Sequence, residues 1–519
     1  MEGTIFSLIP AVLMLVLVLL TRNVLLSLGT GIIVGALLIH DFSILDSLKE
    51  IWMQFYTLFV SSDGAINTGN VLLLTFLLLL GVMTAFLQAS GGSQAFGEWM
   101  IKKVKTRSGA QAMSAVLGLI IFIDDYFNSL AVGQIARPLT DRHKISRAKL
   151  AYIIDSTSAP VTVISPISSW GAYIIGIMGG LFAANGITTL EPLEAFIKMI
   201  PYNLYAIAAV ISVFLVAYLK ADIGPMRKHE IRAMQTGELI DPKQDKVPGD
   251  LSDTFTPHQG GKIYHLLVPI GVLIVATVSS MVITGAMATE ENVNILTIFA
   301  NTNVNLSLFA GGIIAVLTSY LFHMGQRKPR NSSLKIVFEG AKTMMPAIYI
   351  LLLAWMIGSI IGVLETGEYL AGIVSDLSLN PAFLPFLFFI IAGFMALATG
   401  TSWGTFGIML PIAAEVSTIT DMEMLIPSMA AVLAGSVFGD HCTPISDTTI
   451  LSATGAGANH IDHVMTQLPY AFISAFAASI GYILVGFTNQ VILPLAVSLS
   501  IIIAFTTIIH FMKNTRTEE

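Results

Sequence analysis

Apolar segments long enough to cross a membrane recur along the whole chain and constrain its fold more than any other feature. A helix needs about 20 apolar residues to cross a hydrocarbon core about 30 Å thick. Only 11% of the 519 residues are charged, less than half of the share that is usual in soluble domains. Segments of spanning length lie near 4–21, 24–40, 71–89, 200–219, 263–285, 305–323, 346–364, 465–487 and 490–512. The sequence therefore predicts an all-α polytopic membrane protein.

Four further apolar segments are too long, or too interrupted, to be single straight spans. Segments 109–138 and 382–417 carry Gly and polar residues at their midpoints, and each arm has about 14–18 residues, roughly 21–27 Å of helix. Because such arms are shorter than the hydrocarbon core, we interpret both segments as re-entrant hairpins. Segments 148–183 and 425–454 contain Pro or Gly beside polar residues, and we interpret them as interrupted helices.

The distribution of Lys and Arg orients these segments, because short loops with an excess of basic residues face the cytoplasm. The main basic loops are 102–107, 137–149, 220–262 and 327–342. The predicted external loops, which together hold one basic residue, Lys49, are 41–70, 286–304, 365–381 and 418–424. The N-terminus is then outside, the C-terminus is cytoplasmic, and the two hairpins enter from opposite sides.

In this topology the two halves of the chain repeat one another with opposite orientation. The predicted units are a first repeat 1–219, a cytoplasmic linker 220–262, a second repeat 263–487, and an extra C-terminal helix with its tail, 488–519. They contain about 11 transmembrane helices, two re-entrant hairpins and two interrupted helices. Inverted repeats with broken helices indicate a binding site near the middle of the membrane. The alternative is roughly 13 or 14 plain spans without symmetry.

The midpoints of the hairpins are the first candidates for a site. Hairpin one turns at Phe122–Asn128 and hairpin two at Thr399–Thr405. Irregular backbone at membrane depth is tolerated only where it is buried in protein or lines a cavity. The backbone carbonyls at the end of each first arm, together with nearby side-chain oxygens, are suitable ligands for a small alkali cation. We predict Asp125 as an ion-binding residue, with supporting oxygen ligands from Asp124, Asn128, Thr401, Ser402 and Thr405. The alternative for Asp124 is a cap on the second arm.

The interrupted helices supply three more acids. Asp155 begins a polar stretch that ends at Pro160, and Asp440 and Asp447 lie in Gly439–Thr449 without a Lys or Arg in their own span. A carboxylate in hydrocarbon costs several kcal/mol unless it is paired, protonated or facing a wet cavity. Neighbouring buried carboxylates also resist joint ionisation, so one can hold a proton until a cation arrives. The predicted supporting ligands here are Ser156, Thr157, Thr443, Ser446 and Thr448. The alternative for any single acid is a neutral, hydrogen-bonded structural role.

Other marked residues carry weaker signals. His441 is interpreted either as tuning Asp440 or as a hydrogen-bonding spacer. His460 and His463 are expected in a solvated cytoplasmic loop, with a pH-sensing role as the alternative. A single Cys442 excludes intramolecular disulfides. There is no Walker A loop, H-E-x-x-H or dinucleotide fingerprint, so we expect neither an enzyme nor a bound cofactor.

Three stretches of the chain, Phe438–Ser452, Gly400–Thr405 and Ile123–Asn128, resemble the NhaC-type sodium/proton antiporters of bacteria. The resemblance extends from about residue 70 to about residue 485, and the run Gly-Asp-His-Cys-Thr-Pro-Ile-Ser-Asp is its most specific part. It implies inverted repeats, two hairpins and a homodimer with an elevator mechanism. Because the family also includes exchangers of sodium for organic acids such as malate and lactate, the resemblance implies sodium coupling more firmly than pure ion exchange.

The leading hypothesis is an antiporter of the bacterial cytoplasmic membrane that exchanges Na⁺, with Li⁺ as a surrogate, for H⁺ at one carboxylate cluster. The second hypothesis is sodium-coupled transport of a small organic solute, such as a carboxylate or an amino acid, that contacts Asn128, Ser402 and Thr405. An intramembrane aspartyl protease is disfavoured because no Tyr-Asp pair occurs in a span. A channel is disfavoured because hairpins from both sides suit alternating access. Besides these solutes we expect lipid as a partner and no nucleic acid.

Overall fold

The computed structural model of this chain is built almost entirely of helices. It describes residues 2–515, apart from 22, 62–63, 123, 167, 188–189, 243–254, 290–292, 328–330, 367–368, 370–371 and 373–379. Within this range, sheet-type pairing is limited to one isolated bridge between Val60 and Ile66. The predicted fold class, an all-α polytopic membrane protein, is confirmed. Parts of the predicted linker 220–262 and of the loops 286–304, 327–342 and 365–381 lie outside the described residues.

Eight helices of the described chain are long and apolar enough to cross a membrane. They are α4 (Thr68–Ala89), α13 (Tyr264–Ala288), α15 (Val304–Gly325), α16 (Ser333–Val363), α18 (Leu384–Thr399), α20 (Leu425–Cys442), α22 (His460–Thr488) and α23 (Ile492–Thr515). A ninth span results if α10 (Pro192–Met199) and α11 (Leu204–Leu219), which meet at a bend of 49°, are counted as one. The first two expected spans are shorter helices, α1 (Ile9–Thr21) and α2 (Val24–Ile39).

The other helices are shorter or more polar. They are α3 (Ile44–Thr57), α5 (Gly92–Lys103), α6 (Arg107–Ile120), α7 (Asp125–Arg142), α8 (Arg147–Val163), α9 (Ser169–Ala184), α12 (Gly224–Gln235), α14 (Ile295–Ala300), α19 (Ser402–Thr420) and α21 (Asp447–Ala456). Basic residues that were assigned to the loop 137–149 belong largely to the ends of α7 and α8. The connection itself is limited to residues 143–146.

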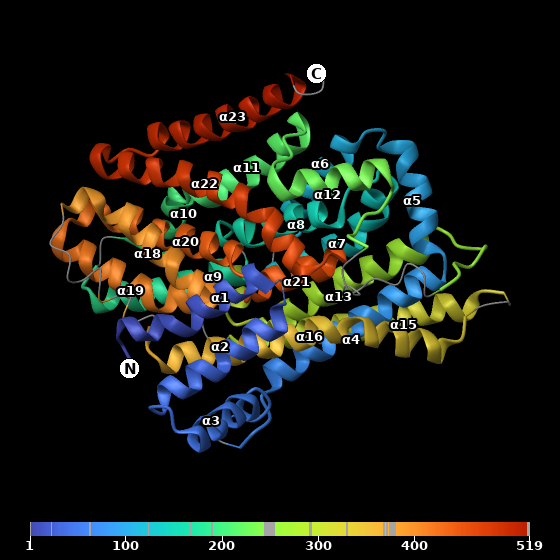
Figure 1. Cartoon of the computed structure of the whole chain (residues 1–519), viewed down its shortest axis with the longest axis horizontal. Helices are drawn as coiled ribbons and strands as arrows, with labels where there is room; N and C mark the ends of the chain where they lie inside the picture. The colour runs from blue at the N-terminus through green and yellow to red at the C-terminus, as the bar shows by residue number, and fades with distance from the viewer. Residues whose placement is uncertain are drawn as a thin grey trace.

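Two groups of helices flank a central set (Figure 1). One group consists of α2, α4, α13, α15 and α16, in which α13 packs on α15, α15 on α4, α4 on α16 and α16 on α2. The other consists of α11, α18, α19, α20 and α22. Between them lie α7, α8 and α21, and the short helix α21 contacts α7, α8, α16 and α22. This central position lets α21 join residues from distant parts of the chain.

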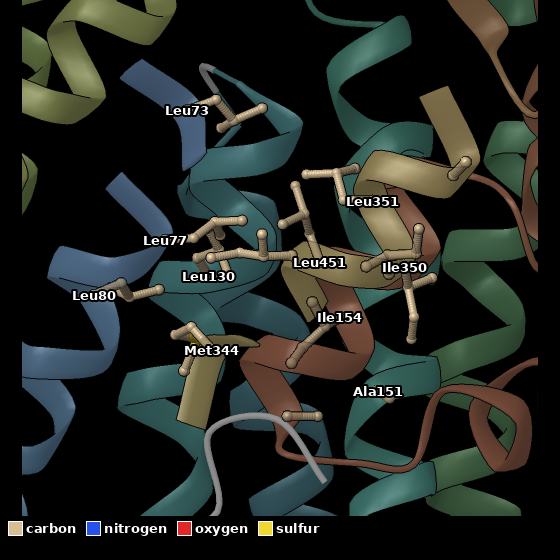
Figure 2. Packing of buried hydrophobic residues seen from close by; sticks show 14 of the residues in the cluster. Leu73, Leu77, Leu80, Leu130, Ala151, Ile154, Met344, Ile350, Leu351 and Leu451 are labelled. Carbon is tan, nitrogen blue, oxygen red and sulfur yellow. The ribbon is translucent and has the colours of Figure 1, made fainter. Parts of the chain in front are cut away.

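The apolar side of the centre is tightly filled. Figure 2 shows Leu130 of α7 and Leu451 of α21 among Leu77 of α4 and Leu351 and Met344 of α16. All five side chains are almost completely buried. One face of α21 is therefore held by hydrophobic packing, which leaves its other face to carry polar groups.

The two predicted hairpins each contain a helix break. α6 ends at Ile120 and α7 begins at Asp125, while α18 ends at Thr399 and α19 begins at Ser402. In both cases the two arms contact each other. Gly400 causes the second break directly, because its φ of 73° lies in the left-handed region that other residues avoid. The inverted symmetry of the two halves stays a prediction.

The two interrupted helices differ in detail from the prediction. α20 and α21 are separated by residues 443–446, which include Pro444. α8, however, runs through Pro160 to Val163, so the expectation that Pro160 ends the helix is wrong. A buried helix tolerates a proline where neighbouring hydroxyl groups can satisfy the freed backbone carbonyl. The break comes later, before Ser168, where Pro166 disfavours helical geometry at Ser165. Asp155 therefore lies inside a helix and not at a break.

Candidate functional site

The first turn of α7 presents three consecutive polar side chains, each with a different partner. Asp124 caps the helix, because its Oδ1 accepts from the Phe127 backbone N–H at 3.0 Å. Its Oδ2 accepts from the Ser169 hydroxyl at 2.9 Å. Asp125 accepts a bond from Trp170 Nε1 at 2.8 Å. The hydroxyl of Tyr126 donates to Asp447. Asp124 thus has the capping role that was weighed as its alternative, and the next two residues face the centre of the molecule.

Asn128 closes the gap between the arms of hairpin one. Its Nδ2 donates to the carbonyl oxygens of Gly118 at 2.7 Å and Ile121 at 2.6 Å, both at the end of α6. These carbonyls have no partner within their own helix, since the helix ends there. The Asn128 amide oxygen is buried and has no hydrogen-bond partner. Asn128 therefore holds the two arms of the break together and keeps one amide oxygen unbonded.

Asp440 lies near the end of α20 and connects hairpin two to α21. Its Oδ2 accepts from the Ser402 hydroxyl at 2.9 Å and from the Thr448 hydroxyl at 3.4 Å. Its Oδ1 is buried without a hydrogen-bond partner, as is the Thr443 hydroxyl next to the break. Ser446 caps α21 by accepting from the Thr449 backbone N–H. The break between α20 and α21 is thus lined by oxygen atoms.

Asp155 on α8 has the most complete set of partners. Its Oδ1 accepts from the Ser452 hydroxyl at 3.0 Å. Its Oδ2 accepts from Gln467 Nε2 at 2.6 Å and lies 3.3 Å from His463 Nε2. Thr449 bridges the acids, because its hydroxyl lies 3.4 Å from this same Oδ2 and 3.3 Å from the backbone oxygen of Asp440. The side chain of Asp155 is completely buried.

Helix α21 therefore joins three of the predicted acids directly, Asp447, Asp440 and Asp155, and it reaches Asp125 only through the neighbouring residue Tyr126. Its residues 447, 448, 449 and 452 contact Tyr126, Asp440 and Asp155, and Tyr126 directly follows Asp125. A close approach of backbones makes this possible: a Cβ placed on Gly455 of α21 would lie 2.3 Å from the Ser129 carbonyl oxygen of α7. Any larger residue would push the two helices apart. The local sequence thus allows the polar faces of α7 and α21 to meet.

No Lys or Arg of the described chain forms an ion pair or hydrogen bond with these four acids. Basic side chains on the neighbouring helices α6 and α8 are engaged elsewhere. Lys149, which is buried, pairs with Asp222 at 2.6 Å, and Arg107 pairs with Glu230 on α12 at 2.8 Å. Burial raises the pKa of the Glu230 carboxyl above its ordinary value, and the charge of Asp222 raises it further. Apart from His463, which lies 3.3 Å from Asp155, protons and cations are the positive charges left for the four acids.

Oxygen atoms, not nitrogen or sulfur ligands, define what the site can bind. In the described part of the chain no three His, Cys, Asp or Glu side chains are grouped as a metal site. A hard monovalent cation would instead need carboxylate, amide, hydroxyl and backbone oxygens together. Around the four acids, the buried oxygens that lack hydrogen-bond partners belong to Asp125, Asn128, Asp440, Thr443 and Gln467. Oxygen donors of these kinds are the ligands that hard cations prefer.

Some predicted supporting residues serve their own helices. The Thr157 hydroxyl donates to the Ile153 carbonyl at 2.8 Å, and the Thr405 hydroxyl donates to the Thr401 carbonyl at 2.9 Å. Thr401 also caps α19. Ser156 is buried on α8 beside Asp155. The hydrogen bonds of the three threonine hydroxyls thus stay within their own helices.

The placement of His460 and His463 corrects the expectation of a solvated loop. Both lie on α22 and are buried, since α22 begins at His460 and its first turn packs into the protein. His460 Nε2 lies 2.7 Å from the Pro444 carbonyl oxygen, so it fixes the break before α21. His441 contacts the Tyr205 hydroxyl at 3.0 Å and not Asp440, which favours the spacer interpretation.

Sequence reasoning missed Tyr126, Trp170, Ser452 and Gln467 as partners of the acids. One signal for Gln467 was present, because His463 and Gln467 are four residues apart at the start of an apolar helix and so share a face. The partners of Tyr126 and Trp170 follow only from the three-dimensional packing.

The fold and the site together define a class: a polytopic membrane protein with acids gathered around helix breaks in its interior, which is the architecture of a secondary transporter. The chain belongs to the Na⁺/H⁺ antiporter family, whose model matches residues 161–487. The matched range contains Asp440 and Asp447, whereas Asp125 and Asp155 precede it. The predicted family resemblance is thus confirmed, and the chain belongs among transporters.

Three relatives are similar over different lengths. An uncharacterized protein of Haemophilus influenzae is 48% identical over 493 residues, which cover 94% of this chain and 92% of that protein. The malate-2H⁺/Na⁺-lactate antiporter of Bacillus subtilis is 28% identical over 201 residues, covering 37% of this chain and 40% of that protein. An uncharacterized Na⁺/H⁺ antiporter of H. influenzae is 33% identical over 141 residues, covering 26% of this chain and 29% of that protein.

Proposed function

We propose that this protein exchanges Na⁺, and Li⁺ in its place, for H⁺ across the bacterial cytoplasmic membrane. One observation carries the proposal: Asp125 and Asp440 each keep one buried carboxylate oxygen without a hydrogen-bond partner, and neither pairs with a Lys or Arg of the described chain. A buried carboxylate without a fixed counter-ion is stable only with a proton or a cation. Membership of the Na⁺/H⁺ antiporter family supports the same choice of ions.

The mechanism is competition for one set of oxygens. When protons occupy the acids, the site is neutral and each acid can donate a hydrogen bond. When Na⁺ enters, it displaces protons, and the unpartnered oxygens of Asp440, Asn128 and Thr443 replace part of its water shell. Because protonated and Na⁺-bound forms have similar net charge, either can cross the membrane. Alternating access then carries the site from one side to the other, in a homodimer whose two inverted repeats move relative to each other.

A second function is favoured by one relative. The antiporter of B. subtilis moves malate, protons, Na⁺ and lactate according to its name. In this chain Trp170 and Trp403 lie edge to face with ring centres 5.8 Å apart, beside Asp125 and Ser402. Such aromatic surfaces could border a small organic solute that binds together with Na⁺.

The test uses purified protein in vesicles that contain a pH-sensitive dye. External Na⁺, Li⁺, K⁺ and a panel of carboxylates and amino acids are added one at a time. Antiport predicts proton movement with Na⁺ or Li⁺ alone, whereas solute coupling predicts a response only when Na⁺ and a solute are both present.

Two variants test the proposed carriers. Asp440→Asn and Asp447→Asn keep size and some hydrogen bonding but cannot ionise, so both should abolish Na⁺-driven proton flux while the protein still inserts. Glu415→Gln is the matched control, because Glu415 is exposed on α19. Well-folded Asp440→Asn and Asp447→Asn proteins with normal exchange would end the competition mechanism.

A further inference from the structure

A second polar cavity lies away from the acids, at the end of the molecule that is predicted to be cytoplasmic. It has a volume of about 240 Å³ and is bordered by α4, α5, α7 and the start of α8. Three arginines line it, Arg137, Arg142 and Arg147, together with one acid, Asp141. Its neutral polar lining includes the side-chain amides of Gln88 and Gln134. The transport site described above uses none of these residues.

The charges of the lining do not balance. Arg147 forms two parallel bonds with Asp141, at 2.6 and 2.8 Å, so this pair is close to neutral. Arg142 reaches Glu98 only at 3.5 Å, and both of these side chains are about half exposed. Arg137 is buried in the wall. The lining holds three guanidinium groups and one carboxylate, and Glu98, the partner of Arg142, adds a second carboxylate, which leaves a net charge of +1.

This combination matches a specific class of ligand. A guanidinium presents a planar set of donors that pairs with two oxygens of a carboxylate or phosphate at once. Side-chain amides and hydroxyls add neutral donors around such a group. The cavity has room for several water molecules, and so for one phosphate or one small dicarboxylate. We propose that this cavity binds a small oxyanion, either a phosphate group or a carboxylate.

The cavity is also connected to α21. Arg147 Nη1 donates to the Ala456 carbonyl at 3.0 Å, at the C-terminal end of that helix. A Cβ on Gly457 would lie 2.7 Å from Arg137 Nη2, so the Arg137 guanidinium covers the same end. Cations at this position are favourable because a helix C-terminus carries partial negative charge. An oxyanion in the cavity would share the two arginines with the end of α21. The proposed binding does not depend on the proposed transport function.

The experiment measures binding directly in purified protein held in nanodiscs of a neutral phospholipid. Inorganic phosphate and succinate are titrated calorimetrically against a background of constant chloride and without Na⁺. Wild-type protein should bind at least one of them saturably. Arg142→Gln and Arg137→Gln should each weaken this binding about tenfold or more, because each removes a charged hydrogen-bond donor.

Controls separate this site from general charge effects and from lipid. Lys198→Gln removes a half-exposed cation on α10 and should leave the affinity unchanged. Nanodiscs that contain phosphatidylglycerol identify the source of the oxyanion. If phosphatidylglycerol competes with inorganic phosphate for binding, the cavity is assigned to a lipid headgroup. If it does not compete, the cavity is assigned to a free anion. The half-exposed Arg142 is the safer variant if Arg137→Gln does not fold. The proposal would be overturned if the wild-type protein showed no saturable binding of phosphate or succinate. It would also be overturned if folded Arg142→Gln bound them as strongly as the wild type.

Discussion

Replacing Tyr126 with phenylalanine tests the connection between hairpin one and α21 with the smallest possible change. The substitution removes one hydroxyl and keeps the ring, so packing around α7 is preserved. The lost group is the hydrogen-bond donor to Asp447. A hydroxyl that donates to a carboxylate stabilises the ionised acid more than the protonated acid. The Na⁺-bound form, in which Asp447 is ionised, should therefore lose more stability than the proton-bound form.

The magnitude follows from the type of bond. A hydrogen bond to a charged group contributes about 1.5–3 kcal/mol. At 1.4 kcal/mol for each factor of ten, the apparent affinity for Na⁺ should fall about 10- to 150-fold at fixed pH. The lower end applies if water replaces the missing hydroxyl, because Asp447 is only half-buried. Maximal proton flux at saturating Na⁺ should change less.

The assay is the Na⁺ concentration that gives half-maximal proton flux in dye-loaded vesicles. Tyr218→Phe serves as the matched control, because it makes the same chemical change away from the site. Tyr218 lies on α11 and is 79% exposed. A folded Tyr126→Phe protein with the Na⁺ affinity of the wild type would refute the argument that Asp447 carries the ion.

Three further predictions test coupling, topology and packing. If protons and Na⁺ share carboxylates, the apparent Na⁺ affinity should fall as the pH is lowered from about 9 to about 6, and a flat profile would indicate separate sites. On a Cys442→Ser background, Lys144→Cys should react with an impermeant thiol reagent only from the cytoplasm, and Val293→Cys should react only from outside. Labelling of both cysteines from the same side would contradict the inverted topology. Gly455→Ala should destabilise the protein by about 1–3 kcal/mol through the clash with α7, seen as a lower Tm in detergent. Gly176→Ala, whose Cβ would meet nothing within 4 Å, should be silent by the same measurement.

The sequence predicted the polar centre because membranes make buried acids conspicuous. Asp125, Asp440 and Asp447 stand out in apolar surroundings, since a charged group at membrane depth needs a functional or structural reason. The breaks at Gly400 and Pro444 were also predictable, because each residue restricts or releases the backbone in a known way. These inferences use local chemistry alone.

What the sequence did not reveal is which residues face one another. Asp155 bonds Ser452 and Gln467, about 300 positions away in the chain, and no local pattern encodes that pairing. The solvated loop expected at His460 is a helix start, because Asn459 caps it and neighbouring helices bury its first turn. Pro160 shows the same limit, since the surroundings of a helix decide whether it tolerates a proline.

The short helix α21 explains how so few acids can act as one site. A helix of 10 residues is marginal on its own, so its position depends on what holds its two ends and its sides. Its first residue, Asp447, bonds Tyr126, whereas its last turn is capped by Arg147 and its apolar face packs against α16. Under the proposed mechanism, exchanging a proton for Na⁺ at Asp447 would change the contacts at the first of these ends. Because the same helix contacts Asp155 and Asp440, we expect any displacement of α21 to change the contacts of both acids together. Coupled exchange at one site requires such a joint change.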